Sequence, residues 1–72
     1  EVESVFATWC AHLRPVQREL LRRCVDGPVA VRDDGERRQM NLLVLRRLVF
    51  PHDSLYSLTP GEAWRRYVRD AL

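Results

Sequence analysis

The stretch Met40–Phe50, which reads MNLLVLRRLVF, is the most apolar run in the chain and decides the predicted fold. Its apolar residues recur at helical spacing in two stripes. The first stripe consists of Met40, Leu43, Val44 and Leu48. The second stripe consists of Leu42, Leu45 and Val49. A helix that is apolar on two sides has neighbours on two sides or faces a partner. We therefore predict a central helix whose second stripe either packs into the core or forms an unfilled binding surface.

The rest of the chain predicts further helices around this one. Apolar residues at helical spacing indicate helices over about residues 2–13, 15–26, 35–50 and 60–72. Trp9 and Trp64 each lie in the middle of an apolar stripe, so both are expected to anchor the core. The predicted fold is all-α: a small bundle of four helices, in which the first two form an antiparallel hairpin because their linker is short.

Proline and polar residues set the expected boundaries of these helices. Pro15 suits the first position of the second helix, and Gly27 suits the position just after its end. The third helix is expected to stop before Pro51, because the residue preceding a proline avoids helical geometry. Thr59 and Glu62 have the spacing of a capping box, with a proline between them at the first helical position of the fourth helix.

Two arrangements are open for residues 28–40. In the first, Asp34-Gly35 turns a small hairpin whose return strand is 37–40. In the second, which the polar residues favour, Asp33 or Asp34 caps the third helix and a short extended segment near 29–32 crosses the bundle. Residues 51–58 are expected to form an apolar loop that packs against the domain and carries Tyr56.

Length and composition restrict the classes of protein that the chain can belong to. Seventy-two residues make a single domain, and a domain of this size buries only about 60% of its unfolded surface. It can surround a small core, and it has little room for a deep substrate cavity. The chain begins with Glu1 and not with Met, so we expect residues 1–72 to be a piece of a longer protein. No apolar run approaches 18 residues, so no transmembrane helix is expected.

The cysteines and histidines show no pattern of a metal or catalytic site. In the predicted helical hairpin, Cys10 and Cys24 are offset by about 7–8 Å along the axis, which is too far for a disulfide. Both are expected to be buried free thiols of a protein in an intracellular, reducing compartment. His12 and His52 lack the ligand spacing of a zinc site. We therefore expect no metal, no cofactor and no enzymatic activity.

The basic residues are all arginine, and they suggest an alternative function. Arginine pairs occur at 22/23, 37/38, 46/47 and 65/66, and together they could form a face that binds phosphate. Against this, ten acidic residues are interspersed and the net charge is only +2. The pattern favours a solvated surface of ion pairs, with nucleic-acid binding as the alternative.

The preferred hypothesis is a non-enzymatic protein-interaction module. Its groove would bind a short amphipathic or apolar motif of a protein partner, and arginines at the rim would favour an acidic one. The candidate contact residues are Leu42, Leu45, Arg46, Arg47, Val49 and Tyr56. The alternatives are a nucleic-acid-binding helical domain and a homodimerisation domain that uses the second stripe.

Overall fold

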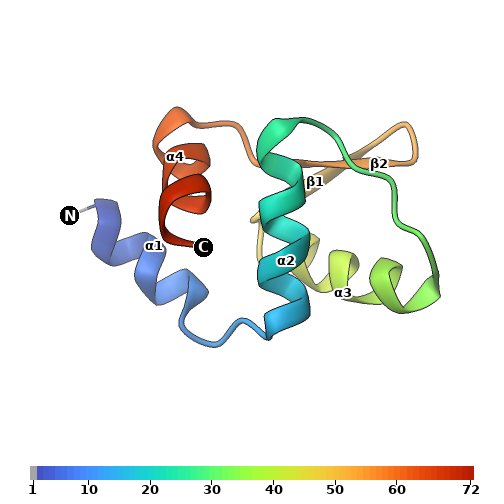
Figure 1. Cartoon of the computed structure of the whole chain (residues 1–72), viewed down its shortest axis with the longest axis horizontal. Coiled ribbons are helices and arrows are strands. Elements are labelled where there is room, and N and C mark those ends of the chain that lie inside the picture. The colour runs from blue at the N-terminus through green and yellow to red at the C-terminus, as the bar shows by residue number, and fades with distance from the viewer. Residues whose placement is uncertain (1) are drawn as a thin grey trace.

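A computed structural model of the protein describes the backbone of residues 2–72 and the side chains of residues 5–72 (Figure 1). Within that range the chain forms four α-helices and a two-stranded antiparallel sheet. The elements are α1 (Val2–Cys10), α2 (Pro15–Arg23), the short 3-10 helix η1 (Cys24–Asp26), α3 (Asp34–Leu45), β1 (Val49–His52), β2 (Leu55–Leu58) and α4 (Glu62–Ala71). The prediction of an all-α bundle is therefore wrong, because a β-hairpin replaces the end of the third helix and the loop after it.

The apolar run breaks where α3 ends, five residues before the predicted boundary. Arg47 adopts a left-handed conformation with φ 63°, and its N–H donates to the carbonyl of Val44 over 2.9 Å. The N–H of Leu48 donates to the carbonyl of Leu43 over 3.1 Å. These two bonds form a Schellman motif, which terminates a helix by satisfying its last carbonyls. The sequence hides this stop, because the left-handed position holds arginine instead of the usual glycine.

The residues after this stop form the β-hairpin. The two-residue turn Asp53-Ser54 has positive φ at both positions (50° and 68°), as a type I′ turn requires. In the register, Val49 pairs with Leu58 and Pro51 pairs with Tyr56. Three of these four side chains are buried, so this face of the hairpin packs on the core. The predicted loop 51–58 packs down as expected, but as a strand pair.

The extended segment after α2 joins the hairpin. The N–H of Val29 donates to the carbonyl of Tyr56 over 2.8 Å, and the N–H of Tyr56 donates back over 2.9 Å. The hairpin with Asp34-Gly35 at its turn is not formed. Instead, Asp33 caps α3, as predicted, because its Oδ1 accepts a hydrogen bond from the N–H of Glu36 over 2.8 Å.

The core lies between α2, α3, the hairpin and α4. Its fully buried side chains are Leu20, Leu21, Cys24, Met40, Leu43, Leu48, Val49 and Val68. Trp64 anchors α4 as predicted: it is buried and its Nε1–H donates to the carbonyl of Leu48 over 3.1 Å. The predicted capping box is not formed, since Gly61 is the N-cap of α4 and Thr59 Oγ1 donates to the carbonyl of Arg47 over 2.6 Å.

α1 packs on α4 through aromatic rings. The ring of Phe6 lies 5.2 Å from those of Trp9 and Trp64 and 5.4 Å from that of Tyr67, between centroids. The predicted hairpin of the first two helices is therefore replaced by pairing of α1 with α4, while α2 packs between α4 and α3 (Figure 1). Trp9 is 42% exposed, so it is not the core anchor that the sequence suggested.

No helix within residues 2–72 is both long enough and apolar enough to cross a lipid bilayer.

Candidate interaction surfaces

The two predicted apolar stripes differ in burial along the C-terminal half of α3. Met40 and Leu43 of the first stripe are fully buried. Leu42 and Leu45 of the second stripe are 43% and 78% exposed. Residues three apart on a helix lie on one side of it, so these two leucines form an apolar patch that the domain itself does not cover.

Two of the predicted contact residues do not belong to this patch. Val49 is only 2% exposed, because β1 turns its side chain into the core. Tyr56 is 6% exposed, and its hydroxyl donates to Oδ1 of Asn41 over 3.0 Å. The proposed groove of Leu42, Leu45 and Val49 is therefore not formed. Its geometry assumed that the helix continued to residue 50, and Val49 leaves the stripe once the helix ends at Leu45.

Arg46 joins the patch to α1. Its Nη2 donates to the carbonyl of Trp9 over 2.9 Å and so satisfies a carbonyl at the C-terminal end of α1. Leu42 lies one helical turn before Arg46 and hence on the same side of α3. This bond holds the backbone end of α1, while the ring of Trp9 packs against Phe6 and Trp64, with centroids 5.2 and 5.8 Å away. We call Leu42, Leu45 and Arg46 the α3 surface; sequence reasoning missed the contact of Arg46 with α1, because the two are far apart in the chain.

Arg47, the remaining predicted contact residue, lies at the edge of the α3 surface. Its side chain is exposed, and its backbone ends α3 and accepts the hydrogen bond from Thr59. Arg47 thus has a structural role in its backbone, while its guanidinium remains available to a partner.

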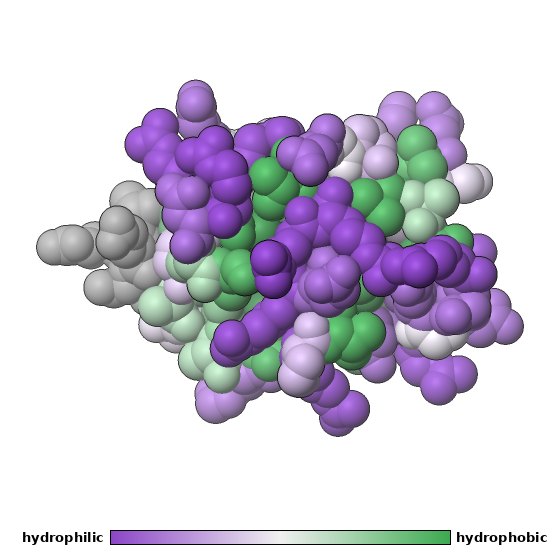
Figure 2. Space-filling model, in the orientation of Figure 1, coloured by the Kyte–Doolittle hydropathy of each residue, from purple (hydrophilic) through white to green (hydrophobic). Residues whose placement is uncertain are grey.

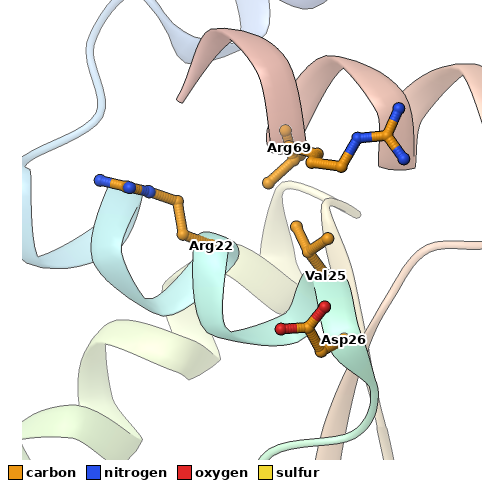
Figure 3. Close-up of a pocket in the computed structure, with 5 residues that line it drawn as sticks. Arg22, Val25, Asp26 and Arg69 are labelled. Atoms are coloured by element: carbon orange, nitrogen blue, oxygen red, sulfur yellow. The ribbon is translucent and has the colours of Figure 1, made fainter.

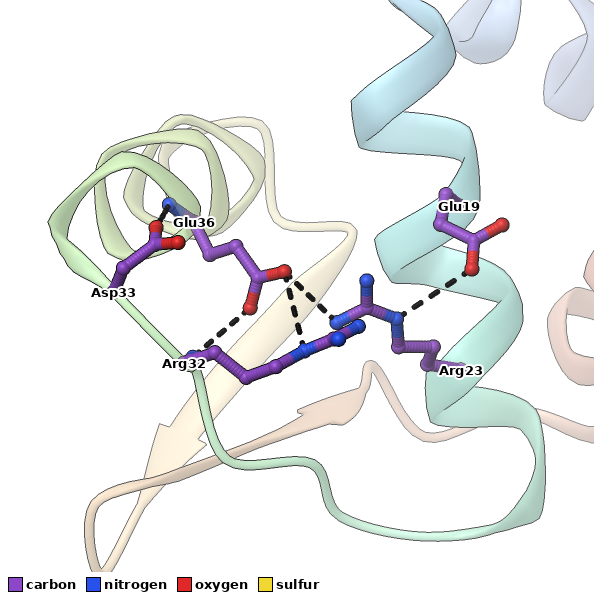
Figure 4. A network of polar contacts seen from close by, with 5 residues as sticks. All are labelled: Glu19, Arg23, Arg32, Asp33 and Glu36. Atoms are coloured by element: carbon purple, nitrogen blue, oxygen red, sulfur yellow. Dashed lines mark hydrogen bonds and ion pairs between the residues drawn. The ribbon is translucent and has the colours of Figure 1, made fainter.

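A cluster of charged side chains between α2 and the start of α3 stabilises the fold (Figure 4). Glu36 Oε2 lies 3.1 Å from Arg23 Nη1 and 3.5 Å from Arg32 Nε, and Glu36 Oε1 accepts from the backbone N–H of Arg32 over 2.9 Å. Arg23 also pairs with Glu19 over 3.5 Å. The hydrogen bond from the Arg32 backbone, followed by Arg23, lowers the pKa of Glu36, which therefore stays ionised in this network.

The arginine pairs are not equivalent. One member of each of three pairs binds within the domain: Arg23 binds the acidic network, Arg46 binds α1, and Arg65 Nη1 donates to the carbonyl of Val25 over 2.7 Å. Other arginine side chains make no hydrogen bond or ion pair with the described part of the chain; these include Arg18, Arg22, Arg37, Arg38 and Arg66. Pairing in the sequence therefore does not by itself mark a binding face.

A shallow cleft of about 210 Å³ lies between α2 and α4 (Figure 3). Its lining consists of Arg22, Val25, Asp26, Val68 and Arg69. In Figure 3 the guanidinium groups of Arg22 and Arg69 extend in different directions, and the carboxylate of Asp26 lies over η1, further from α4 than Val25. Because the guanidinium groups diverge, the cleft does not enclose a small anion, but both groups are presented to solvent.

Both cysteines lie buried, as predicted, and are free. Burial raises the pKa of Cys24 to about 11, and burial also raises that of Cys10 despite the nearby charges of Arg18 and Arg46. Both thiols are therefore protonated at neutral pH, where a thiol is a weak nucleophile. Among the described residues, no three His, Cys, Asp or Glu side chains are grouped so that they could hold a metal ion.

Comparisons with protein-family models, with curated proteins and with solved structures find no match to this chain, so its function has to be argued from its own residues.

Proposed function

We propose that the chain is a non-enzymatic interaction module whose α3 surface binds a short amphipathic or apolar segment of an acidic protein partner. The observation that carries the proposal is the 78% exposure of Leu45 beside the half-exposed Leu42, one helical turn away on the same side of α3. Single exposed leucines are ordinary, but a contiguous apolar patch is typical of an interaction site.

Charge supports an acidic partner. Arg46 and Arg47 follow Leu45 directly, and both side chains are exposed. No acidic side chain is paired with either of them among the described residues. Arginine at the rim of an apolar patch attracts carboxylates, speeds the encounter and disfavours basic partners. The partner segment would therefore place apolar side chains on Leu42 and Leu45 and acidic ones towards Arg46 and Arg47.

The patch is small, so the affinity should be modest. Burying a largely exposed leucine contributes about 1.5–3 kcal/mol, and Leu42 contributes less because the domain already half covers it. The costs of association cancel part of this gain. We expect a dissociation constant in the micromolar range, about −8 kcal/mol, as is usual for a short segment on a preformed surface.

The test uses a displayed library of 16-residue peptides, selected for binding to the protein and then measured against variants. Leu45→Glu should fold like the parent, because exposed substitutions usually change stability by less than about 0.5 kcal/mol. Its affinity for the selected acidic amphipathic peptides should fall at least about tenfold, which corresponds to about 1.4 kcal/mol. Phe50→Glu is the matched control, since Phe50 is also an exposed apolar residue but lies on β1.

Three results would contradict the proposal. A large fall in the melting temperature of Leu45→Glu would show that Leu45 contributes to the core. Equal peptide binding by Leu45→Glu and the parent would remove the α3 surface from consideration. A sedimentation mass of two chains for the parent and one for Leu45→Glu would show that the surface binds a second copy of the chain instead of a partner protein.

A further inference from the structure

The two flanks of α2 differ in how their arginines are used. On the flank towards α3, Arg23 pairs with Glu19 and Glu36 (Figure 4). On the flank towards α4, Arg18 and Arg22 have no partner among the described residues. They lie four residues apart, one above the other on the helix, about 6 Å apart along its axis. The α3 flank is thus neutralised by Glu19 and Glu36, whereas Arg18 and Arg22 on the α4 flank form no ion pair within residues 5–72, although Asp26 lies near Arg22.

α4 continues the basic flank across the cleft. Arg65 is held there because its Nη1 donates to the carbonyl of Val25, at 2.7 Å. Arg69 lines the cleft opposite Arg22, and its Nε contacts Asp70 over 3.1 Å, which leaves its terminal nitrogens without a partner (Figure 3). We call Arg18, Arg22, Arg65 and Arg69 the arginine face.

We propose that the arginine face binds the phosphate backbone of nucleic acid without sequence preference. The guanidinium group suits this ligand because its planar set of donors matches two phosphate oxygens at once. Arginines on two packed helices present several such groups, and Figure 2 shows mainly hydrophilic side chains over α2 and α4. Because Arg22 and Arg69 diverge, they would contact separate phosphates of one backbone. The cleft between them is lined by valines, arginines and Asp26, with none of the asparagine or glutamine side chains that read adenine. Contact is therefore expected with phosphates and not with base edges.

The surroundings of the face favour nucleic acid over a membrane. Stable binding in a lipid interface is strengthened by apolar side chains that enter the headgroup region. Among residues 5–72, the exposed large apolar side chains are Val5, Trp9, Val16, Leu42, Leu45 and Phe50, and none of them lines the cleft. Asp26 and Asp70 lower the positive charge of the face, so we expect a non-specific dissociation constant of about 10⁻⁴–10⁻⁶ M near physiological salt.

Fluorescence anisotropy with a labelled duplex DNA of about 20 base pairs and mixed sequence tests the proposal. The logarithm of the association constant should fall linearly with the logarithm of the salt concentration. If the four arginines neutralise four phosphates, the slope should be about −3 to −4. Arg18→Gln/Arg22→Gln should reduce the steepness of that slope by about 2 and weaken binding at least about tenfold at low salt. Arg37→Gln/Arg38→Gln removes the same charge from α3, where both side chains also lack a partner, and should change binding much less.

Asp26→Asn provides a variant with the opposite expected effect. It removes a negative charge from the cleft without removing a large side chain, and it should tighten DNA binding by about two- to fivefold. A merely structural role of this residue would not increase affinity. Circular dichroism of each variant checks that the helices are intact before its binding is compared.

The proposal is overturned if the parent shows no DNA binding at low salt, or if the two double variants weaken it equally, which would indicate net charge alone. It is also overturned if poly-glutamate competes as well as DNA at equal charge concentration, which would assign the face to acidic proteins. Tight binding to anionic vesicles of phosphatidylserine, unaffected by DNA, would assign it to membranes. None of these results bears on the α3 surface, whose tests use peptides and Leu45.

Discussion

The two halves of the run Met40–Phe50 are almost equally apolar, yet the first half is helical and the second half begins a strand. The helical half is held by its own backbone and by the burial of Met40 and Leu43. The strand half is held from outside: the carbonyl of Leu48 accepts hydrogen bonds from the N–H of Thr59 and from Trp64 Nε1. Apolar content therefore placed the run in the core, while contacts with distant residues decided its secondary structure.

Removing the distant support should have the largest effect. Trp64→Ala removes a buried ring and the hydrogen bond to Leu48, and such truncations cost about 3–5 kcal/mol. A domain of this size has roughly 5 kcal/mol of stability, so the variant should be largely unfolded in a thermal melt followed by circular dichroism. Trp9→Ala is the matched control and should cost less, since Trp9 is half-exposed. Equal losses for the two tryptophans would contradict this assignment of roles.

Improving the stop between the two halves should have a smaller, opposite effect. Arg47→Gly removes the strain of a left-handed arginine, worth about 1–2 kcal/mol, and should raise the melting temperature by roughly 4–8 °C per kcal/mol. Arg46→Gly removes the same charge at a position with φ −86°, where glycine relieves no strain, adds freedom to the unfolded chain and loses the hydrogen bond to the carbonyl of Trp9. It should lower the melting temperature. If Arg47→Gly were also destabilising, the left-handed turn would not be what ends α3.

The N-terminal end of α3 is stabilised by the ion pairs of Glu36, so its contribution to the free energy of unfolding should depend on pH. The lowered pKa of Glu36 means that its ion pairs stabilise the fold above the pKa of an unfolded glutamate, about 4.3, and that this stabilisation is lost as pH falls through the folded value. Glu36→Gln should melt below the parent at pH 7, and the difference should shrink towards roughly pH 3. Asp34→Asn, in the same turn but without an ion pair, should show a smaller difference. A Glu36→Gln difference that is independent of pH would contradict the network.

The parts of the fold that follow from local chemistry could be predicted from the sequence. The cap of α3 was narrowed to Asp33 or Asp34, of which Asp33 is the N-cap, and Trp64 was predicted to anchor the core, because each depends on residue type and helical spacing. The end of α3 could not be predicted, because arginine at the left-handed position gives no signal and a short apolar run is compatible with helix or strand. The hairpin turn was hidden for the same reason, since Asp53-Ser54 lacks the glycine that usually marks it.

The candidate site was predictable only in part. Leu42 and Leu45 were placed on one side of a helix by spacing alone, and the structure leaves both exposed. Val49 was assigned to the same side only because the helix was extended too far. The hydrogen bond between Arg46 and the carbonyl of Trp9 joins residues 37 positions apart, and no local pattern reports such a contact.

Pro51 interrupts the backbone donors on the free edge of β1, which matters for contacts with other chains. Tyr56, its partner in the register, directs both its backbone groups to Val29, so the backbone of Pro51 faces the free side of β1. A proline there has no N–H to offer, and an approaching strand meets an interrupted row of donors. An exposed strand edge is a template on which identical chains can stack into fibrils. Pro51, which was predicted only to end a helix, therefore disfavours the pairing of a second chain with the free edge of β1.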